Sequence, residues 1–162
     1  MRLAIIADTH MPKGARRLPD ECVARLEQAD LIVHAGDLTE LSALHELQSY
    51  APVVAVHGNV DSPEVRAGLP ARTQVDAGGA TIAVIHDAGP ARGRLARMKT
   101  RFPEADAVVF GHSHIPLHEV AEDGFQIFNP GSPTERRRAS HRTMGAATAE
   151  HGKIAFELLV LG

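Results

Sequence analysis

Short apolar runs that end directly in potential metal-ligating residues recur five times along this chain. In order, they are residues 3–7 before Asp8-Thr9-His10, 31–35 before Gly36-Asp37, 53–56 before Gly58-Asn59-Val60-Asp61, 81–85 before His86-Asp87, and 108–110 before Gly111-His112-Ser113-His114. Runs of this length and composition are typical of buried strands. Ligands of open parallel sheets bind beyond the carboxyl ends of the strands. The sequence therefore predicts that five strand ends converge on one site.

Two segments between the first three runs carry apolar residues at helical spacing. They are residues 19–28 and 41–48, where Pro19 suits a first helical turn and Thr39 is the expected N-cap. Strands that alternate with helices in this way predict a parallel sheet with right-handed crossovers.

The second half begins with a predicted hairpin, in which Gly78-Gly79 separates strands over 73–75 and 81–85. A helix is expected around 92–100. Most of the remaining segments are strand-like and lie between glycine-containing turns: 107–110, 115–120, 126–128, 143–149 and 154–160. We expect this half to be largely antiparallel. Both halves are predicted to share one core of packed sheets flanked by helices, in a single domain over 1–162.

The overall composition excludes several classes of protein. With 44% hydrophobic and 23% charged residues, the chain resembles ordinary globular proteins and not disordered ones. A net charge of −3 and a pI near 6.3 argue against a general nucleic-acid or membrane binder, so any anion affinity must be local. The single cysteine, Cys22, cannot form an internal disulfide, and Asp8 interrupts the first apolar run too early for a signal peptide or membrane span. We expect a cytoplasmic protein.

The polar residues at the strand ends have a composition that needs an electrostatic explanation. An isolated histidine near a core is more often hydrogen-bonded than bound to metal, so no single motif suffices. Together, however, two carboxylates, one amide and four imidazoles would be costly to desolvate without a compensating cation. The predicted metal ligands are Asp8, His10, Asp37, Asn59, His86, His112 and His114.

In the order of these motifs, the chain resembles the calcineurin-like metallophosphoesterase superfamily. It is most similar to the small bacterial and archaeal branch that also includes the retromer scaffold subunit, and the resemblance extends to Asn129-Pro130-Gly131-Ser132. It implies a four-layer αββα sandwich of two mixed sheets flanked by helices. It also implies two divalent metal ions per chain and hydrolysis of a phosphate ester.

The resemblance divides the ligands between two metal ions. Asp8, His10, Asp37 and His114 would hold one ion, and Asp37, Asn59, His86 and His112 the other, with Asp37 bridging. A bridging carboxylate can hold two cations about 3.5–4 Å apart, which suits in-line displacement at phosphorus. The imidazole, carboxylate and amide set suits manganese, our first expectation, or nickel, cobalt, iron or zinc.

Two divalent cations against two carboxylates leave a net positive site, so a small phosphate ester is the expected substrate. A bridging hydroxide would attack phosphorus. The ligands that we expect at the reacting phosphate are Asp37, Asn59 and His112. Asp61 is expected to orient one of the ligands. Since the histidine ligands must be neutral, activity should fall below roughly pH 6 to 6.5.

The chain departs from many superfamily members at Val60, where they carry a histidine thought to protonate the leaving group. Valine cannot donate a proton, so the site should favour good leaving groups or recruit water or another residue as the acid. In this respect the chain resembles branch members associated with phosphodiester substrates. We therefore predict diester over monoester substrates. Asp87 also replaces an expected glycine, so we expect that loop to differ from the family pattern.

The other histidines and the basic residues have ordinary interpretations. His34 and His57 are predicted to be hydrogen-bonded core or supporting residues, and surface positions are expected for His45, His118, His141 and His151. Arg136-Arg137-Arg138 is more typical of a solvated face than of a phosphate clamp. Lys13, Arg16 and Arg17 could attract anions to the site.

Two other functions remain open at this stage. One is a non-catalytic protein-binding scaffold on the same fold, against which the complete ligand set argues. The other is a nuclease, which the absence of a broad basic face makes the weaker alternative. A homo-oligomer is possible, and no membrane partner is expected.

Overall fold

The computed structural model describes all residues, 1–162, and contains two five-stranded mixed sheets. The first sheet has the order β10-β9-β1-β2-β3 and the second β4-β5-β6-β8-β7. Its strands are β1 (Arg2–Ile6), β2 (Leu31–His34), β3 (Val53–Ala55), β9 (Arg142–Glu150) and β10 (Lys153–Leu161). Those of the second sheet are β4 (Arg72–Ala77), β5 (Ala80–Ile85), β6 (Ala107–Val109), β7 (Leu117–Val120) and β8 (Gln126–Asn129).

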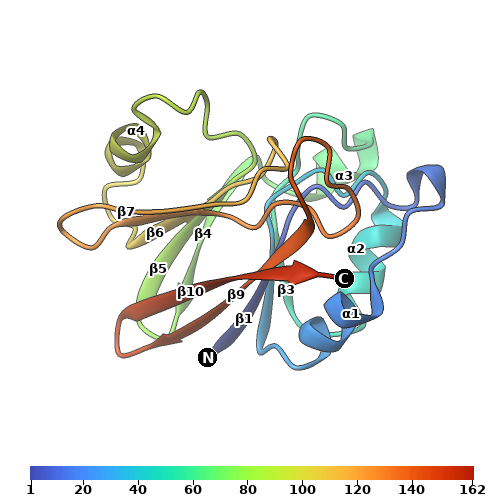
Figure 1. Ribbon diagram of the computed structural model, residues 1–162, viewed down its shortest axis with the longest axis horizontal. Coiled ribbons are helices and arrows are strands. Elements are labelled where there is room, and N and C mark those ends of the chain that lie inside the picture. The colour runs from blue at the N-terminus through green and yellow to red at the C-terminus, as the bar shows by residue number, and fades with distance from the viewer.

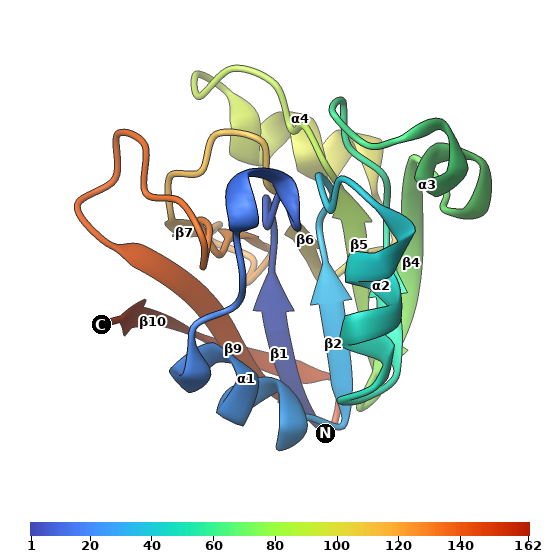
Figure 2. The ribbon, with the colours of Figure 1, turned by 90° about the vertical axis from the view of Figure 1, so that its right-hand side faces the viewer.

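Helices cover the outer face of each sheet, which gives the four predicted layers (Figures 1 and 2). The helices α1 (Asp20–Glu27) and α2 (Leu41–Gln48) pack on the first sheet, and α4 (Arg94–Arg101) packs on the second. The short α3 (Pro63–Gly68), which the sequence pattern did not predict, begins where the Ser62 side chain accepts a hydrogen bond from Val65 N. A 3-10 turn, η1 (Lys13–Ala15), precedes α1.

The apolar residues form three packed layers between these elements. Alternate residues of β1 and β2, such as Ile5 and Val33, face Ile82, Val84 and others across the two sheets. The opposite face of the first sheet packs on the helices, where Cys22 is fully buried. Burial raises the pKa of this thiol to about 12, so Cys22 acts in packing and not as a nucleophile.

One expectation about the fold holds only in part, and another was wrong. In the second half of the chain the pairs β4–β5, β7–β8 and β9–β10 are antiparallel as expected, but β5, β6 and β8 run parallel, with α4 lying in the connection from β5 to β6. Thr39 does not cap α2, since Glu40 occupies the N-cap. Thr39 lies one residue earlier in a left-handed turn (φ 94°), where its N–H donates to Asp61 Oδ1.

No helix of the structure has both the length and the apolar character needed to cross a membrane.

Candidate metal centre

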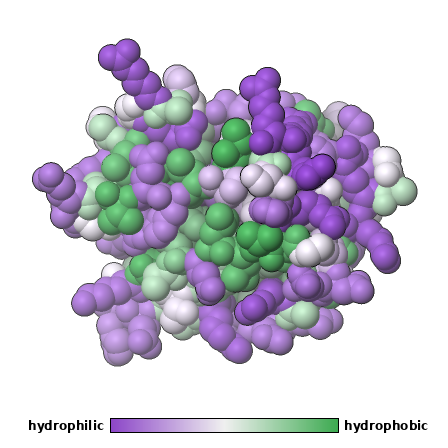
Figure 3. Space-filling view, viewed as in Figure 1, coloured by the Kyte–Doolittle hydropathy of each residue, from purple (hydrophilic) through white to green (hydrophobic).

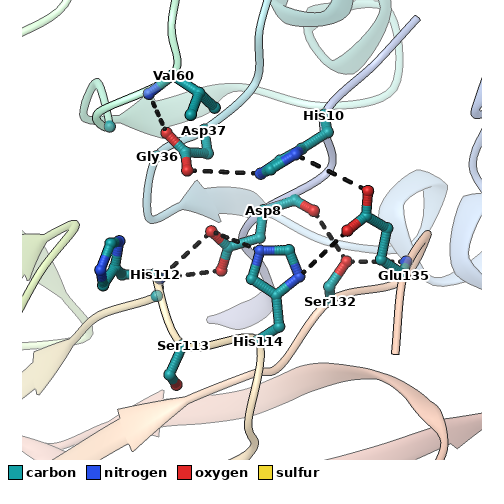
Figure 4. Close-up of polar contacts among 12 residues, drawn as sticks. Asp8, His10, Gly36, Asp37, Val60, His112, Ser113, His114, Ser132 and Glu135 are labelled. Carbon is teal, nitrogen blue, oxygen red and sulfur yellow. Dashed lines mark hydrogen bonds and ion pairs between the residues drawn. The ribbon is translucent and has the colours of Figure 1, made fainter. Parts of the chain in front are cut away.

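The strand ends of both sheets meet at one edge, where five of the seven predicted ligands lie in two overlapping groups. Asp8, His10 and His114 form one group, and Asp8, Asp37 and His86 form the other. Within each group the potential ligand atoms lie within 4.8 Å of one another, and all five side chains are buried. Figure 4 shows Asp8 between His114 and His112, with Asp37 facing His10.

Unusual backbone conformations aim these side chains at the site. The residues with positive φ include five of the predicted ligands: Asp8 (56°), His10 (47°), Asp37 (61°), His112 (70°) and His114 (61°). Side chains other than glycine rarely adopt this conformation, and each instance costs free energy that the surrounding structure must offset. Their concentration at the strand ends marks a functional edge that the fold holds in place.

Asp37 occupies the centre of the site. Its Oδ2 lies 3.4 Å from His10 Nε2 and 3.2 Å from His86 Nε2, while its Oδ1 accepts a hydrogen bond from Val60 N. One carboxylate oxygen therefore faces imidazoles from both predicted metal positions. Gly58 permits this approach, because a Cβ at Gly58 would overlap the Asp37 carboxylate.

His86 and Asn59 form the side of the site next to Asp37. The His86 Nδ1 lies 2.8 Å from the carbonyl oxygen of Ala35 and donates to it, so in the neutral imidazole Nε2, which is directed at the site, would be the nitrogen able to bind a metal ion. Asn59 Oδ1 lies 3.0 Å from His86 Nε2 and 3.1 Å from His112 Nδ1. The two imidazoles and the amide oxygen thus converge on one point.

His10 and His114 carry the strongest sign that this cluster fits a metal ion. The buried atoms His10 Nε2, His114 Nδ1 and His114 Nε2 have no hydrogen-bond partner. Buried polar atoms without partners are costly and rare. A divalent cation would satisfy such nitrogens, and imidazole with carboxylate is a suitable donor set for it. The residues present therefore fit a divalent metal ion.

The electrostatics of the carboxylates and imidazoles agree with this fit. Burial raises the pKa of Asp8 to about 7, although His86 opposes the shift. Burial also acts to raise the pKa of Asp37, but contacts with His10 and His86 outweigh it and hold that pKa below its usual range. Burial, together with Arg137, lowers the pKa of His114 to about 4. A cation would favour ionised Asp8 and neutral His114, the forms that bind metal.

Glu135 was missed in the sequence, and the structure places it behind two of the predicted ligands (Figure 4). Its Oε1 lies 3.9 Å from His10 Nδ1 and its Oε2 lies 3.6 Å from His114 Nδ1. Arg16 and Arg137 form ion pairs with the same carboxylate, so two of the predicted basic residues are bound to Glu135. The only signal in the sequence was its position just after the Asn129–Ser132 turn.

That turn also fastens the first strand end. Ser132 Oγ donates to the Asp8 carbonyl oxygen at 2.8 Å, and Thr134 Oγ1 donates to the Thr9 carbonyl oxygen at 2.8 Å. Residues 132–135 therefore support both the backbone and the side chains of the segment that carries Asp8 and His10.

Asp61 lies between the second and third strand ends. Its Oδ2 accepts hydrogen bonds from the backbone N–H groups of Asp37 (3.1 Å) and Gly58 (2.6 Å), and its Oδ1 accepts from Thr39 N. Both carboxylate oxygens face the backbone, so Asp61 ties the second strand end to the third. The neighbouring Val60 side chain is 45% exposed and offers no proton donor.

The remaining histidines lie outside the ligand groups. His34 is fully buried, accepts a hydrogen bond from Gly36 N, and contacts Thr9 Oγ1 at 3.0 Å. His57 is half-buried and lies near the carbonyl oxygen of Gly58. The predicted surface positions are confirmed for His45, His118, His141 and His151.

A two-sheet sandwich with a cluster of imidazoles and carboxylates at its strand ends defines a class of metal-dependent hydrolases. A family model described as the calcineurin-like phosphoesterase superfamily domain matches residues 1–152. The chain belongs to this superfamily, as its motifs predicted. This membership supports a metal-binding phosphoesterase.

Curated relatives and solved structures agree with the family. The chain is 34% identical over 139 residues to a probable metallophosphoesterase of Methanothermobacter thermautotrophicus, covering 85% of this chain and 80% of that protein. It is also 34% identical to one of Methanocaldococcus jannaschii, covering 85% of this chain and 70% of that protein. Zinc-complexed Vps29 of Entamoeba histolytica shares the fold, with a TM-score of 0.78 at 20% identity over 99% of each chain. The resemblance to the branch that includes Vps29 is thereby confirmed.

Proposed function

We propose that this chain hydrolyses phosphodiesters with two divalent metal ions held at the strand-end cluster. The observation that carries the proposal is the pair of buried ligand groups that share Asp8, with nitrogens on His10 and His114 that make no hydrogen bond. Manganese is the proposed ion, with nickel, cobalt, iron and zinc as alternatives for the same donor set.

Seven residues would hold the two ions in this proposal. Asp8, His10, Asp37 and His114 would bind one ion, and Asp37, Asn59, His86 and His112 the other. Support for a bridging Asp37 comes from its Oδ2, which faces His10 on one side and His86 on the other. Bound divalent cations would activate water and stabilise negative charge on the phosphate oxygens.

The side chains around the cluster would prepare it for the reaction. Asp61 would fix the backbone that carries Asp37, and Glu135 would orient His10 and His114. The Ala35 carbonyl oxygen would keep the His86 proton on Nδ1, away from the reacting phosphate.

The proposed preference for diesters rests on the resemblance at Val60 to branch members associated with phosphodiesters. This residue is exposed beside Asp37 and has no proton to give a poor leaving group. Substrates whose leaving group needs no protonation are therefore favoured.

The test is hydrolysis of bis(p-nitrophenyl) phosphate and p-nitrophenyl phosphate by metal-stripped protein, with and without Mn²⁺. We expect activity that requires metal, favours the diester and disappears in Asp37→Ala. Asp20→Ala, which removes an exposed carboxylate of α1, should leave the rate unchanged. No cleavage of either ester with any of the five metals would reject the proposal.

A protein-binding scaffold is the second candidate, and exposed apolar side chains favour it. Val120 on β7 and Leu158 and Val160 on β10 are 41 to 58% exposed. On the face of the molecule viewed in Figure 3, apolar residues gather among polar ones. A metal-loaded protein that cleaves no ester would shift the proposal to this function.

A further inference from the structure

A pocket of about 390 Å³ adjoins the proposed metal centre on the side of the second ligand group. Asn59 and His86, both predicted ligands, form part of its wall. A pocket of this volume is within the range that binds small molecules. A substrate whose phosphate lies at Asn59 and His86 could therefore place the rest of its molecule in this pocket.

Three arginines from separate elements line the same pocket: Arg66 on α3, Arg72 at the start of β4, and Arg101 at the end of α4. Asp87 is the only carboxylate among the lining residues. The pocket is thus strongly positive, although the chain as a whole carries a net charge of −3. The net charge of the chain argued only against a general affinity for anions, and this pocket is a place where a local affinity is expected.

The three guanidinium groups differ in how they are held. Arg66 donates to the carbonyl oxygens of Asn59 (2.7 Å) and Asp61 (3.3 Å), which fixes it against the ligand loop. The side chains of Arg72 and Arg101 make no hydrogen bond or ion pair within the chain, and Arg101 lies over the Phe102 ring at 5.9 Å. Two guanidinium groups are therefore free to bind an outside anion.

Space continues beyond these two arginines. A neighbouring pocket of about 290 Å³ is lined by Arg72 and Arg101 together with Thr73, Gln74 and Phe102. Arg72 and Arg101 thus stand where the two pockets meet. A substrate that extends away from the metal centre would pass their guanidinium groups.

We propose that Arg66, Arg72 and Arg101 form a subsite for a second phosphate group of the substrate, next to the phosphate that is cleaved. This inference rests on the proposed phosphodiesterase function and narrows it to diesters that also carry a phosphomonoester. A phosphomonoester has a charge of about −1.5 to −2 at pH 7 and three acceptor oxygens, which matches several guanidinium groups better than a singly charged carboxylate.

The kinetic test uses two substrates that differ in a single phosphate. These are thymidine 5′-(p-nitrophenyl phosphate) and the same ester with a 3′-phosphate. For the wild type with Mn²⁺ we expect about a tenfold higher kcat/KM with the 3′-phosphate, as one charge-assisted contact supplies. Arg72→Gln and Arg101→Gln should each reduce that preference, and the double variant should abolish it. The measured quantity is the ratio of kcat/KM between the two substrates, which a general loss of activity would leave unchanged.

The matched control is Arg92→Gln, which removes an exposed arginine outside these two pockets. It should leave the preference unchanged. A wild-type preference near one, or equal loss in Arg92→Gln and the pocket variants, would overturn the subsite. It would leave the phosphodiesterase proposal intact.

A binding measurement on metal-free protein tests the subsite independently of hydrolysis. Calorimetric titration with thymidine 3′,5′-bisphosphate should show binding that weakens about tenfold or more in the double variant and is kept in Arg92→Gln. Undetectable binding by the wild type, or equal binding by the double variant, contradicts the proposal. If neither ester is cleaved, the catalytic proposal fails and this titration still decides the subsite.

Discussion

The two sides of the metal centre are built differently. On one side, His10 and His114 are almost fully buried and are backed by Glu135 and the 132–135 segment. On the other side, the His112 side chain is 46% exposed and Asn59 opens to the arginine-lined pocket. A buried side that is held by its supports and an open side that admits anions suit the two metal positions that we propose. In that proposal, substrate would approach from the open side.

Replacing one histidine from each side tests this asymmetry most directly. In His114→Ala, metal-dependent hydrolysis should fall by more than the roughly 100-fold that loss of a supporting residue can cost, because a buried ligand is removed. In His112→Ala the loss should be smaller, since water can take the place of an exposed ligand. Rates with bis(p-nitrophenyl) phosphate and bound metal per chain measure both effects. Equal losses would remove the distinction between the two sides.

Glu135 should contribute to the metal affinity of the buried side. Glu135→Gln keeps the size of the side chain but removes the charge that faces the Nδ1 atoms of His10 and His114. We expect the affinity for the first bound metal ion to fall about 10- to 100-fold. Competition with a chelating dye measures it.

The control for this substitution is Glu150→Gln, at the exposed end of β9, which should bind metal like the wild type. An unchanged metal affinity in Glu135→Gln would mean that the carboxylate only joins Arg16 and Arg137, and that the buried side needs no such support.

Asp61 supports the open side through the backbone, and its loss should appear in stability. In Asp61→Asn the amide can no longer accept all three backbone hydrogen bonds that the buried carboxylate accepts. The free energy of unfolding of the metal-free protein should fall by about 2 kcal/mol, measured by urea denaturation.

Asp76→Asn is the comparison, because the exposed Asp76 carboxylate accepts a single backbone hydrogen bond from Gly79. Its effect should stay below about 1 kcal/mol. If both variants lose the same stability, Asp61 does not clamp the two strand ends.

Much of this asymmetry lay beyond sequence reasoning. Strand-end placement of Asp8, Asp37 and His86 followed from apolar runs, because the carboxyl ends of parallel strands share an edge of the sheet. Glu135 and the arginines had no such pattern. Glu135 reaches the site through a loop, and Arg66, Arg72 and Arg101 meet only because α3, β4 and α4 pack around one pocket.

The departures from the expected fold have the same origin. The segment with Thr39 showed a residue typical of an N-cap, but the tertiary contact with Asp61 holds its N–H in a turn before the helix. The parallel pairing of β6 with β8 joins strands separated by β7, which local patterns along the chain do not specify. Local sequence indicated most of the elements, and long-range contacts determined how they pair.

The smallest expected effect concerns His34, which lies beneath the buried side. It is a change in how the free energy of unfolding depends on pH. Burial lowers the pKa of His34 to about 3, whereas an unfolded histidine titrates near 6.5. Below pH 6.5 the unfolded chain therefore binds a proton that the folded chain does not, and stability falls as pH falls. Between pH 6.5 and 5.5 this histidine should cost about 1 kcal/mol of unfolding free energy.

The difference between wild type and His34→Gln isolates this contribution, because all other titrating groups are shared. Urea denaturation of both metal-free proteins at pH 6.5 and 5.5 should give a loss about 1 kcal/mol smaller in the variant. His45→Gln, at an exposed position of α2, should keep the wild-type dependence. If His34→Gln also keeps it, His34 is protonated in the folded protein. The contact with Thr9 would then support the strand end between Asp8 and His10 as a charged group, and the buried side would be less apolar than its burial indicates.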